Sequence, residues 1–277
     1  MTRDELLYKW QAPQPVLDCG HVRLVDVMGD DERIEQVARL SYGKGTRSVS
    51  DRRHLLRYLM RNRHTSPFEQ AVITLDMKMP IFVARQLIRH RTASYNELSG
   101  RYSELPEEYY IPDESQVCLQ STTNKQGRGD SLLDADASEM VDLIDASADN
   151  AFRDYRILLD AGVARETARM VLPVSTYTQW CMTMNLHNLL HMLALRLDPH
   201  AQWETRQYAS MIADIVADWV PLTWEAFCDY RINAVTFSSM EMDILRNMLA
   251  GEAADTDFLT EREKKDFFKK LQLTNED

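Results

Sequence analysis

The sequence contains no long apolar run. Nowhere in its 277 residues does an uninterrupted apolar stretch approach the roughly 20 residues that a membrane-spanning helix needs, and residues 1–5 do not lead into the apolar core of a signal peptide. Internal repeats and Pro- or Gly-rich linkers are also missing. These absences argue against a membrane protein, and we expect a cytoplasmic protein with no membrane partner.

Cysteines are few and scattered. No two of them form a CxxC pair, so the sequence signals neither a zinc knuckle nor a redox dithiol. We interpret them as small buried apolar residues or incidental surface thiols, and none has a context that suggests a nucleophile. The four residues are Cys19, Cys118, Cys181 and Cys228.

Positively charged residues are fewer than negatively charged ones. With 32 Lys and Arg against 43 Asp and Glu, the net charge is -11, and the field of such a chain repels nucleic acid and anionic lipid. No basic strip is interleaved with aromatic residues, so a nucleic-acid partner is not expected. A composition of 44% hydrophobic and 27% charged residues is typical of a globular protein. A small anionic ligand still fits if the cations gather locally.

Apolar periodicity predicts an α/β domain with helical decoration. Strands are expected at 22–27 and 71–77, and helices after Asp30, at 51–62, and at 81–91 with Pro80 in its first turn. From about 135 to 227 the pattern is mostly helical. Its interruptions are Gly162, Pro173, Pro199 and Pro221.

Three segments organise the chain. Residues 1–20 lack clear periodicity and are interpreted as an irregular N-terminal arm, residues 21–235 as the main domain, and residues 236–277 as an amphipathic helical extension with a charged end. Within the main domain, residues 113–134 are interpreted as an acidic surface loop. It leads into a helix with a solvated acidic face.

Arginines converge in one short segment. Residues 81–101 hold four arginines, Arg85, Arg89, Arg91 and Arg101, against the single acid Glu97. One interpretation is a solvated helix end, since cations are favoured at a helix C-terminus. The following residues make a second interpretation more attractive, because hydroxyls and amides surround a glycine there. Guanidinium forks with such a loop are suited to binding phosphate.

A second polar cluster accompanies an expected helix at 182–197. An apolar stripe of leucines leaves Asn185, Asn188 and Arg196 on one side and His187 and His191 on the other. Two histidines at this spacing could bind a metal, but Asn188 stands where a zinc helix of the HExxH type has its glutamate. We therefore expect no metal site, and interpret the histidines as structural or as ligand contacts. Arg169, within an apolar run, is expected to need a partner.

The segment RHRTASYNELS at 89–99 resembles the RHR-x7-S signature of the flavin-dependent thymidylate synthases. Further blocks are similar to that family in the same order, at 64–69, 80–86, 169–173 and 195–204, and the similarity covers roughly residues 21–231. The resemblance implies a single-domain α/β (α+β) fold with a central antiparallel or mixed sheet and long helices. Residues 21–235 would be the catalytic domain, with the arm, the acidic loop and the extension as additions.

The resemblance also implies an activity. It is the reductive methylation of dUMP to dTMP, with methylenetetrahydrofolate as carbon donor and FAD, reduced by NADPH, as hydride source, in a homotetramer whose active sites are shared between subunits. The implied FAD contacts are Ser66, Arg89, His90, Arg91, Glu97, Asn185, His187 and His191. The implied dUMP contacts are Gln86, Arg89, Glu97, Leu98, Ser99, Gly100, Arg101, Arg169 and Arg196. Many family members have arginine in place of His187, and some have asparagine in place of His191.

Arg196 is the implied catalytic residue. Fixed against the pyrimidine edge, it would stabilise the negative charge formed when N3 ionises and so direct electron density toward C5. The other class of thymidylate synthase attacks C6 with a thiolate, which this chain does not obviously supply. The alternative function is a non-catalytic nucleotide- or flavin-binding regulatory module that uses the same arginines. A flavin chromophore in the purified protein would separate the two.

Overall fold

The structure, a computed structural model, describes residues 1–41, 51–122, 127–253 and 255–271. The chain divides into two compact units, Met1–Phe227 and Cys228–Asp277. Within the described residues, no helix is both long enough and apolar enough to cross a membrane.

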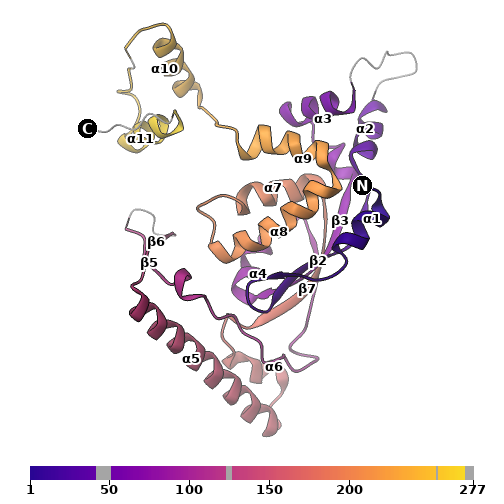
Figure 1. The fold of residues 1–277 in the computed structure, drawn as a ribbon, viewed down its shortest axis with the longest axis vertical. Coiled ribbons are helices and arrows are strands. Elements are labelled where there is room, and N and C mark those ends of the chain that lie inside the picture. Colours follow the sequence, from indigo (N-terminus) through magenta and orange to yellow (C-terminus); the bar gives the residue numbers. More distant parts are fainter. Residues whose placement is uncertain (42–50, 123–126, 254, 272–277) are drawn as a thin grey trace. The chain divides into compact units, whose positions relative to one another are not determined.

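The first unit is built on an antiparallel five-stranded sheet (Figure 1). Its strands, in spatial order, are β1 (Gln14–Val16), β2 (Gly20–Met28), β3 (Val72–Pro80), β7 (Tyr177–Asn185) and β4 (Ser94–Glu97). The central pair is in register along its whole length, and the hydroxyls of Thr74 and Thr183 lie 3.0 Å apart across it. The predicted α/β class and antiparallel sheet are confirmed.

Strand β7 was not predicted, since residues 135–227 were expected to be mostly helical. Alternate side chains of the strand, Thr178, Trp180, Met182 and Met184, are buried, which is the period of a strand with one covered face. The following helix α7 (Leu186–Arg196) consequently begins four residues later than the predicted start at 182. Asn185 ends the strand and caps this helix, because its Oδ1 accepts a hydrogen bond from the backbone N–H of Asn188 at 2.9 Å.

Helix α8 (Trp203–Trp219) packs against β1 and β2 and lies beside α7 (Figure 1). The Tyr208 hydroxyl donates to the backbone O of Lys78 on β3 at 2.8 Å. A Cβ on Gly20 would lie 2.0 Å from this hydroxyl. Only glycine allows such a close approach of helix and strand.

The first twenty residues are not irregular. They form α1 (Arg3–Trp10) and then β1, the edge strand of the main sheet. Thr2 and Glu5 make a reciprocal capping box at the helix start. The side chains of Lys9 and Trp10 bind Asp218 of α8 at 2.6 Å and 2.7 Å, so this segment is attached to the main unit.

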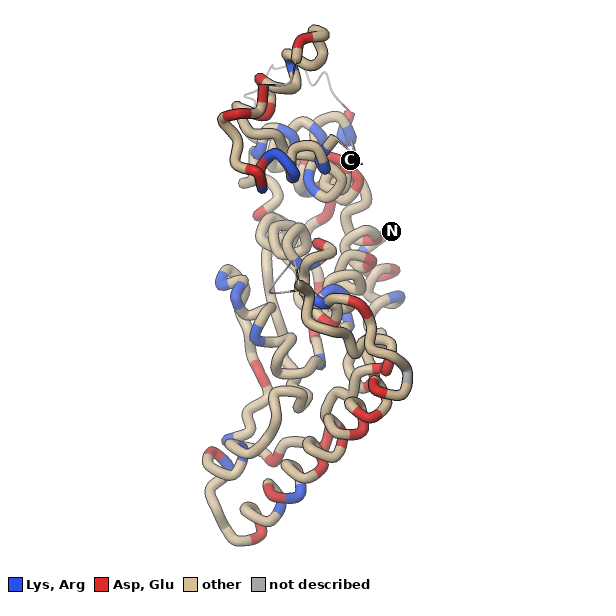
Figure 2. Tube along the Cα trace, turned by 90° about the vertical axis from the view of Figure 1, so that its left-hand side faces the viewer, with Lys and Arg blue, Asp and Glu red and all other residues tan. Residues whose placement is uncertain are grey.

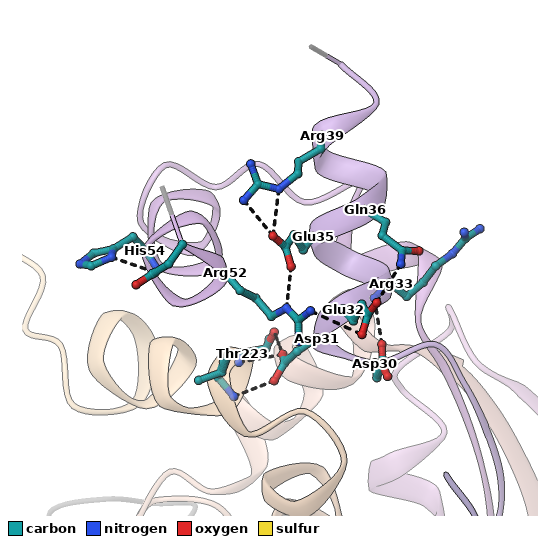
Figure 3. Close-up of polar contacts among 12 residues, drawn as sticks. Asp30, Asp31, Glu32, Arg33, Glu35, Gln36, Arg39, Arg52, His54 and Thr223 are labelled. Carbon is teal, nitrogen blue, oxygen red and sulfur yellow. Dashed lines mark hydrogen bonds and ion pairs between the residues drawn. The ribbon is translucent and has the colours of Figure 1, made fainter. Parts of the chain in front are cut away.

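The predicted helices near 31 and 51 are confirmed as α2 (Asp31–Arg39) and α3 (Arg52–Arg61), capped by Asp30 and Asp51. Figure 3 shows how they meet α9 (Pro221–Phe227). The carboxylate of Asp31 accepts hydrogen bonds from the backbone N–H groups of Leu222 and Thr223 and from the Thr223 hydroxyl. Burial nevertheless raises the pKa of Asp31.

Helix α4 (Ile81–Leu87) ends four residues earlier than predicted, and Pro80 precedes the helix as its N-cap. The Tyr95 hydroxyl donates to the backbone O of Leu87 at 3.2 Å and of His90 at 3.3 Å, which satisfies carbonyls that the helix end leaves free. The RHR segment, residues 89–91, therefore lies in the connection to β4 and not on the helix.

The predicted acidic loop contains a hairpin of β5 (Cys118–Gln120) and β6 (Arg128–Ser131), preceded by the 3-10 turn Glu114–Gln116. The long helix α5 (Asp134–Asp160) follows, and acidic residues recur along it (Figure 2). Phe152 and Tyr155 of α5 form a small core with Ala168 of α6 (Arg165–Ala168).

In its described residues the second unit contains the π-helix Cys228–Ile232 and the α-helices α10 (Ser239–Leu249) and α11 (Glu261–Lys270). Ile244 of α10, Phe267 of α11 and Leu259 between the two helices form a small core. Lys270 donates to both carboxylate oxygens of Glu241, at 2.6 Å and 2.8 Å. Both α-helices lie within residues 236–277, whereas the unit itself begins at Cys228.

Candidate active site

A cavity of about 940 Å³ opens between α4, the end of α7, the start of α8 and the β5–β6 hairpin. Five arginines line it: Arg85, Arg89, Arg128, Arg196 and Arg206. No Asp or Glu is among its described lining residues, and the Nε of Arg206 is buried without a hydrogen-bond partner in the part of the chain that the structure describes. In a chain of net charge -11, this is the local concentration of positive charge that an anionic ligand requires.

Arg196 is held from two sides. Its Nε donates to Nε2 of His90 at 3.0 Å, and its Nη2 donates to the backbone O of Gln86 at 3.2 Å. Burial lowers its pKa, although a guanidinium keeps its charge in proteins. Because Arg196 also lines the cavity, the N–H groups that these two bonds leave over are available to a ligand there.

The amide of Gln86 is fixed by the first turn of α8. Its Oε1 accepts a hydrogen bond from the Thr205 hydroxyl at 3.1 Å, and its Nε2 donates to Oε1 of Gln202. Gln86 thus connects α8 to Arg196 through its side chain on one side and its backbone carbonyl on the other.

His90 is buried, with 9% of its surface exposed. Desolvation, then the neighbouring Arg196 and then His191, whose ring centroid is 6.3 Å away, lower the pKa of His90 to about 4. The imidazole is therefore neutral near pH 7. Its Nε2 accepts the bond from Arg196, so its proton must be on Nδ1.

This histidine predicts a pH effect on stability. Between about pH 6.5 and about pH 4 the unfolded chain binds a proton that folded His90 does not accept, so the free energy of unfolding should fall as the pH falls through that window. Urea unfolding of the wild type and of His90→Gln at about pH 7 and about pH 5 measures it. The variant should lose less stability between the two pH values. An equal loss in both proteins would contradict the assignment.

The second group of predicted dUMP residues lies outside this cavity. A Cβ on Gly100 would lie 3.1 Å from the Leu105 side chain and 3.3 Å from Cδ of Arg169, so Gly100 lets the loop pack on Arg169. Arg101 pairs with Glu166 at 3.2 Å, and more than half of each side chain is exposed. The structure thus separates the predicted dUMP contacts into two groups within one chain. Gln86, Arg89 and Arg196 line the cavity, whereas Glu97, Leu98, Ser99, Gly100, Arg101 and Arg169 are not among its lining residues.

Arg169 differs from its predicted environment. It lies in the 3-10 turn Arg169–Val171, is exposed, and forms no ion pair within the described ranges. Its apolar sequence neighbours had indicated a need for a partner. The residue is instead exposed, so its charge needs no partner from the protein.

The predicted FAD contacts are also dispersed. Arg89 lines the cavity, and His90 lies behind it against Arg196. Asn185 and His187 are half-buried at the start of α7. The exposed members are Ser66, Arg91, Glu97 and His191. Across the described ranges, no group of three or more His, Cys, Asp or Glu side chains is arranged to hold a metal.

The sequence did not identify the contribution of the hairpin and α8 to the cavity. Arg128 forms an ion pair with the buried Glu204 and lies over the ring of Trp203, with Cζ 5.9 Å from the ring centroid. The sequence around Arg128 gave no signal of this contact, because its partner is 76 residues away.

Comparison with known proteins gives a consistent result. The family model described as thymidylate synthase complementing protein matches residues 23–222. A flavin-dependent thymidylate synthase of Ruegeria pomeroyi is 49% identical over 91% of this chain and 86% of its own length, and one of Rickettsia bellii is 44% identical over 97% and 96%. The solved structure of a UMP/dUMP methylase, PolB from Streptomyces cacaoi, bound with 5-Br dUMP, is 35% identical with a TM-score of 0.71 and covers 79% of this chain and 99% of that one.

Proposed function

Because the chain belongs to the flavin-dependent thymidylate synthase family, we propose that it catalyses the reductive methylation of dUMP to dTMP. The observation that carries the proposal is the arginine-lined cavity, in which Arg196 is fixed between His90 and the backbone of Gln86. The similar PolB structures with bound 5-Br dUMP and 5-Br UMP support a pyrimidine nucleotide as substrate.

The donor set fits phosphorylated ligands. Besides Arg128, whose guanidinium is paired with Glu204, four arginines line the cavity of about 940 Å³, and one buried Nε among them is unpaired in the described chain; such groups suit dUMP or the diphosphate of FAD. We assign FAD to the residues that the family resemblance names, Arg89, His90 and Arg91 foremost among them. When bound, FAD reduced by NADPH supplies the hydride, and methylenetetrahydrofolate supplies the carbon.

Arg196 acts on the pyrimidine by position and charge. His90 and the Gln86 carbonyl occupy its inner N–H groups, so that its outer edge is presented to the uracil ring. Negative charge that forms on the ring when N3 loses its proton is stabilised there, and electron density at C5 increases. A neutral His90 is essential to this arrangement, because a protonated imidazole could not accept the bond from Nε.

We further propose that the site is completed by a second subunit of a homotetramer. Gly100, Arg101 and Arg169 are predicted dUMP contacts that do not line the cavity of their own chain. A loop from a neighbouring subunit can bring them to dUMP in a symmetric assembly. The cytoplasmic location stays a prediction.

The test is flavin binding followed by turnover. We expect the purified protein to take up FAD with an oxidised-flavin absorption spectrum that NADPH bleaches under anaerobic conditions, and to form dTMP from dUMP and methylenetetrahydrofolate. Failure to bind flavin supplied in excess would contradict the enzymatic assignment. Flavin binding and reduction without dTMP formation would favour the regulatory module instead.

A further inference from the structure

The β5–β6 hairpin is a wall of the cavity and not a detached surface loop. Its described residues that line the cavity are Cys118, Leu119, Gln120, Ser121, Gly127 and Arg128. The same cavity is lined by Gln202, the N-cap of α8, and by Gln86 in the last turn of α4. A segment outside the family signature thus borders the place assigned to dUMP.

One guanidinium attaches this wall to the rest of the unit. Nη1 of Arg128 donates to the backbone O of Gln116 at 3.2 Å and to its Oε1 at 3.1 Å, while Nη2 forms the ion pair with Glu204. Its Cζ also lies over the Trp203 ring. The planar fork of an arginine binds the turn before β5 and the start of α8 at the same time, which a lysine could not do.

The buried charge of Glu204 is stabilised by its contact with Arg128. Its side chain is 4% exposed, against 33% for Arg128. The Tyr110 hydroxyl approaches Oε1 at 3.4 Å, and Oε2 has no hydrogen-bond partner among the described residues. Arg128 therefore supplies the neutralising charge of a buried carboxylate, and removing only one partner of such a pair is strongly unfavourable.

The attachment reaches the substrate residues through α8. Glu204 lies between Gln202 and Thr205, the two residues that hold the Gln86 amide, and the Gln86 carbonyl accepts from Arg196. On the basis of the proposed function, we propose that Arg128 is a positioning residue for dUMP: it fixes the hairpin wall on the first turn of α8 and thereby the orientation of Gln86.

Steady-state kinetics of Arg128→Gln test the proposal. We expect the KM for dUMP and its Kd by calorimetry to rise about 10-fold or more, the scale of one charge-assisted contact. The kcat at saturating dUMP should stay within about 2-fold, since the lost interactions orient the bound ground state and His90 still holds Arg196. Reduction of bound flavin by NADPH should be unchanged. Arg153→Gln on α5 is the matched control, because Arg153 and its neighbour Asp154 are both exposed.

A second variant separates positioning from stability. In Arg128→Met/Glu204→Gln the buried charge is gone, so the melting temperature should recover relative to Arg128→Gln. The KM for dUMP should remain raised, because nothing fastens the hairpin to α8. If Arg128→Gln does not fold, this double variant and Arg128→Lys carry the test, with an intermediate KM expected for the lysine.

Three results would overturn the proposal. They are an unchanged KM in Arg128→Gln, a KM that returns to the wild-type value when the double variant regains stability, and an equal effect of Arg153→Gln. A wild-type protein that neither binds dUMP nor forms dTMP would contradict the proposed function itself. That failure is distinguishable from failure of the positioning role, in which the wild type is active and the Arg128 variants keep its KM.

Discussion

Replacing Arg196 with alanine is expected to reduce dTMP formation by about 10²- to 10³-fold, the cost of removing one group that stabilises charge in a transition state. His90 and the Gln86 carbonyl fix this guanidinium at the cavity. Among the described residues, no other arginine that lines the cavity is bonded to His90 or to the Gln86 carbonyl and could replace it. Reduction of bound FAD by NADPH should continue at close to the wild-type rate, because it does not require ionised uracil. Anaerobic flavin bleaching and dTMP formation, measured on the same preparation, check both halves.

Arg196→Lys should recover only part of the lost rate. A compact ammonium can supply the charge, but it cannot donate to His90 and the Gln86 carbonyl and still present a planar edge to the ring. Equal activity of the lysine variant and the wild type would show that charge alone suffices. Equal loss of flavin reduction and of dTMP formation in Arg196→Ala would remove Arg196 from the methylation step.

Cys118 provides the control for a thiolate mechanism. It is the one described cysteine among the residues that line the cavity, so it is the thiol best placed to attack C6. Cys118→Ser should still form dTMP if C5 is activated by Arg196. Complete loss of dTMP formation with normal flavin binding would contradict the cysteine-free mechanism.

The sequence was sufficient to predict those elements whose ends depend only on neighbouring residues of the chain. Asp30 and Asp51 cap the two helices that they were expected to start, because a capping carboxylate needs only the next turn of its own chain. The same kind of signal, Thr2 with Glu5, was present at the start of α1, yet residues 1–20 lack clear periodicity and were interpreted as irregular.

The elements that were predicted wrongly, strand β7 and the end of helix α4, depend on contacts with residues elsewhere in the chain. The alternation in β7 runs directly into the leucines of α7, so strand and helix shared one apolar stretch, and pairing with β3 is what makes the first part a strand. At the end of helix α4, the hydroxyl of Tyr95, eight residues beyond Leu87, donates a hydrogen bond to the Leu87 carbonyl. The pattern of apolar residues in the helix gives no indication of this contact.

The site also contains residues that the sequence predicted and residues that it could not predict. The family resemblance predicted that Gln86, Arg89 and Arg196 share a site, and all three line one cavity, although Arg196 is far from the other two in the sequence. Arg128 and Glu204 could not be paired from the sequence, since nothing in either segment identifies the other. Local charge counts also placed Arg128 in an acidic surface loop, whereas one buried carboxylate determines its position.

The separation of the predicted dUMP residues leads to the last expected result. Arg101→Ala should weaken dUMP binding about 10- to 150-fold, the value of one charge-assisted hydrogen bond to phosphate. Its contact with Glu166 in the same chain is exposed on both sides, so little stability should be lost. Arg196→Ala should be nearly inactive for the reason given above. At a dUMP concentration too low to saturate Arg101→Ala, each protein alone should form little dTMP.

Co-expression of the two variants with different affinity tags, followed by purification on both tags, yields mixed tetramers. If each site combines the cavity of one subunit with the loop of another, about a quarter of the sites in randomly mixed tetramers contain both intact arginines, and the mixture should regain about that fraction of wild-type activity. If both groups serve a site within one chain, no combination restores it, because every chain carries one of the substitutions. Activity equal to the mean of the two parents would therefore contradict the shared site, and tetramers of each variant with itself are the matched controls.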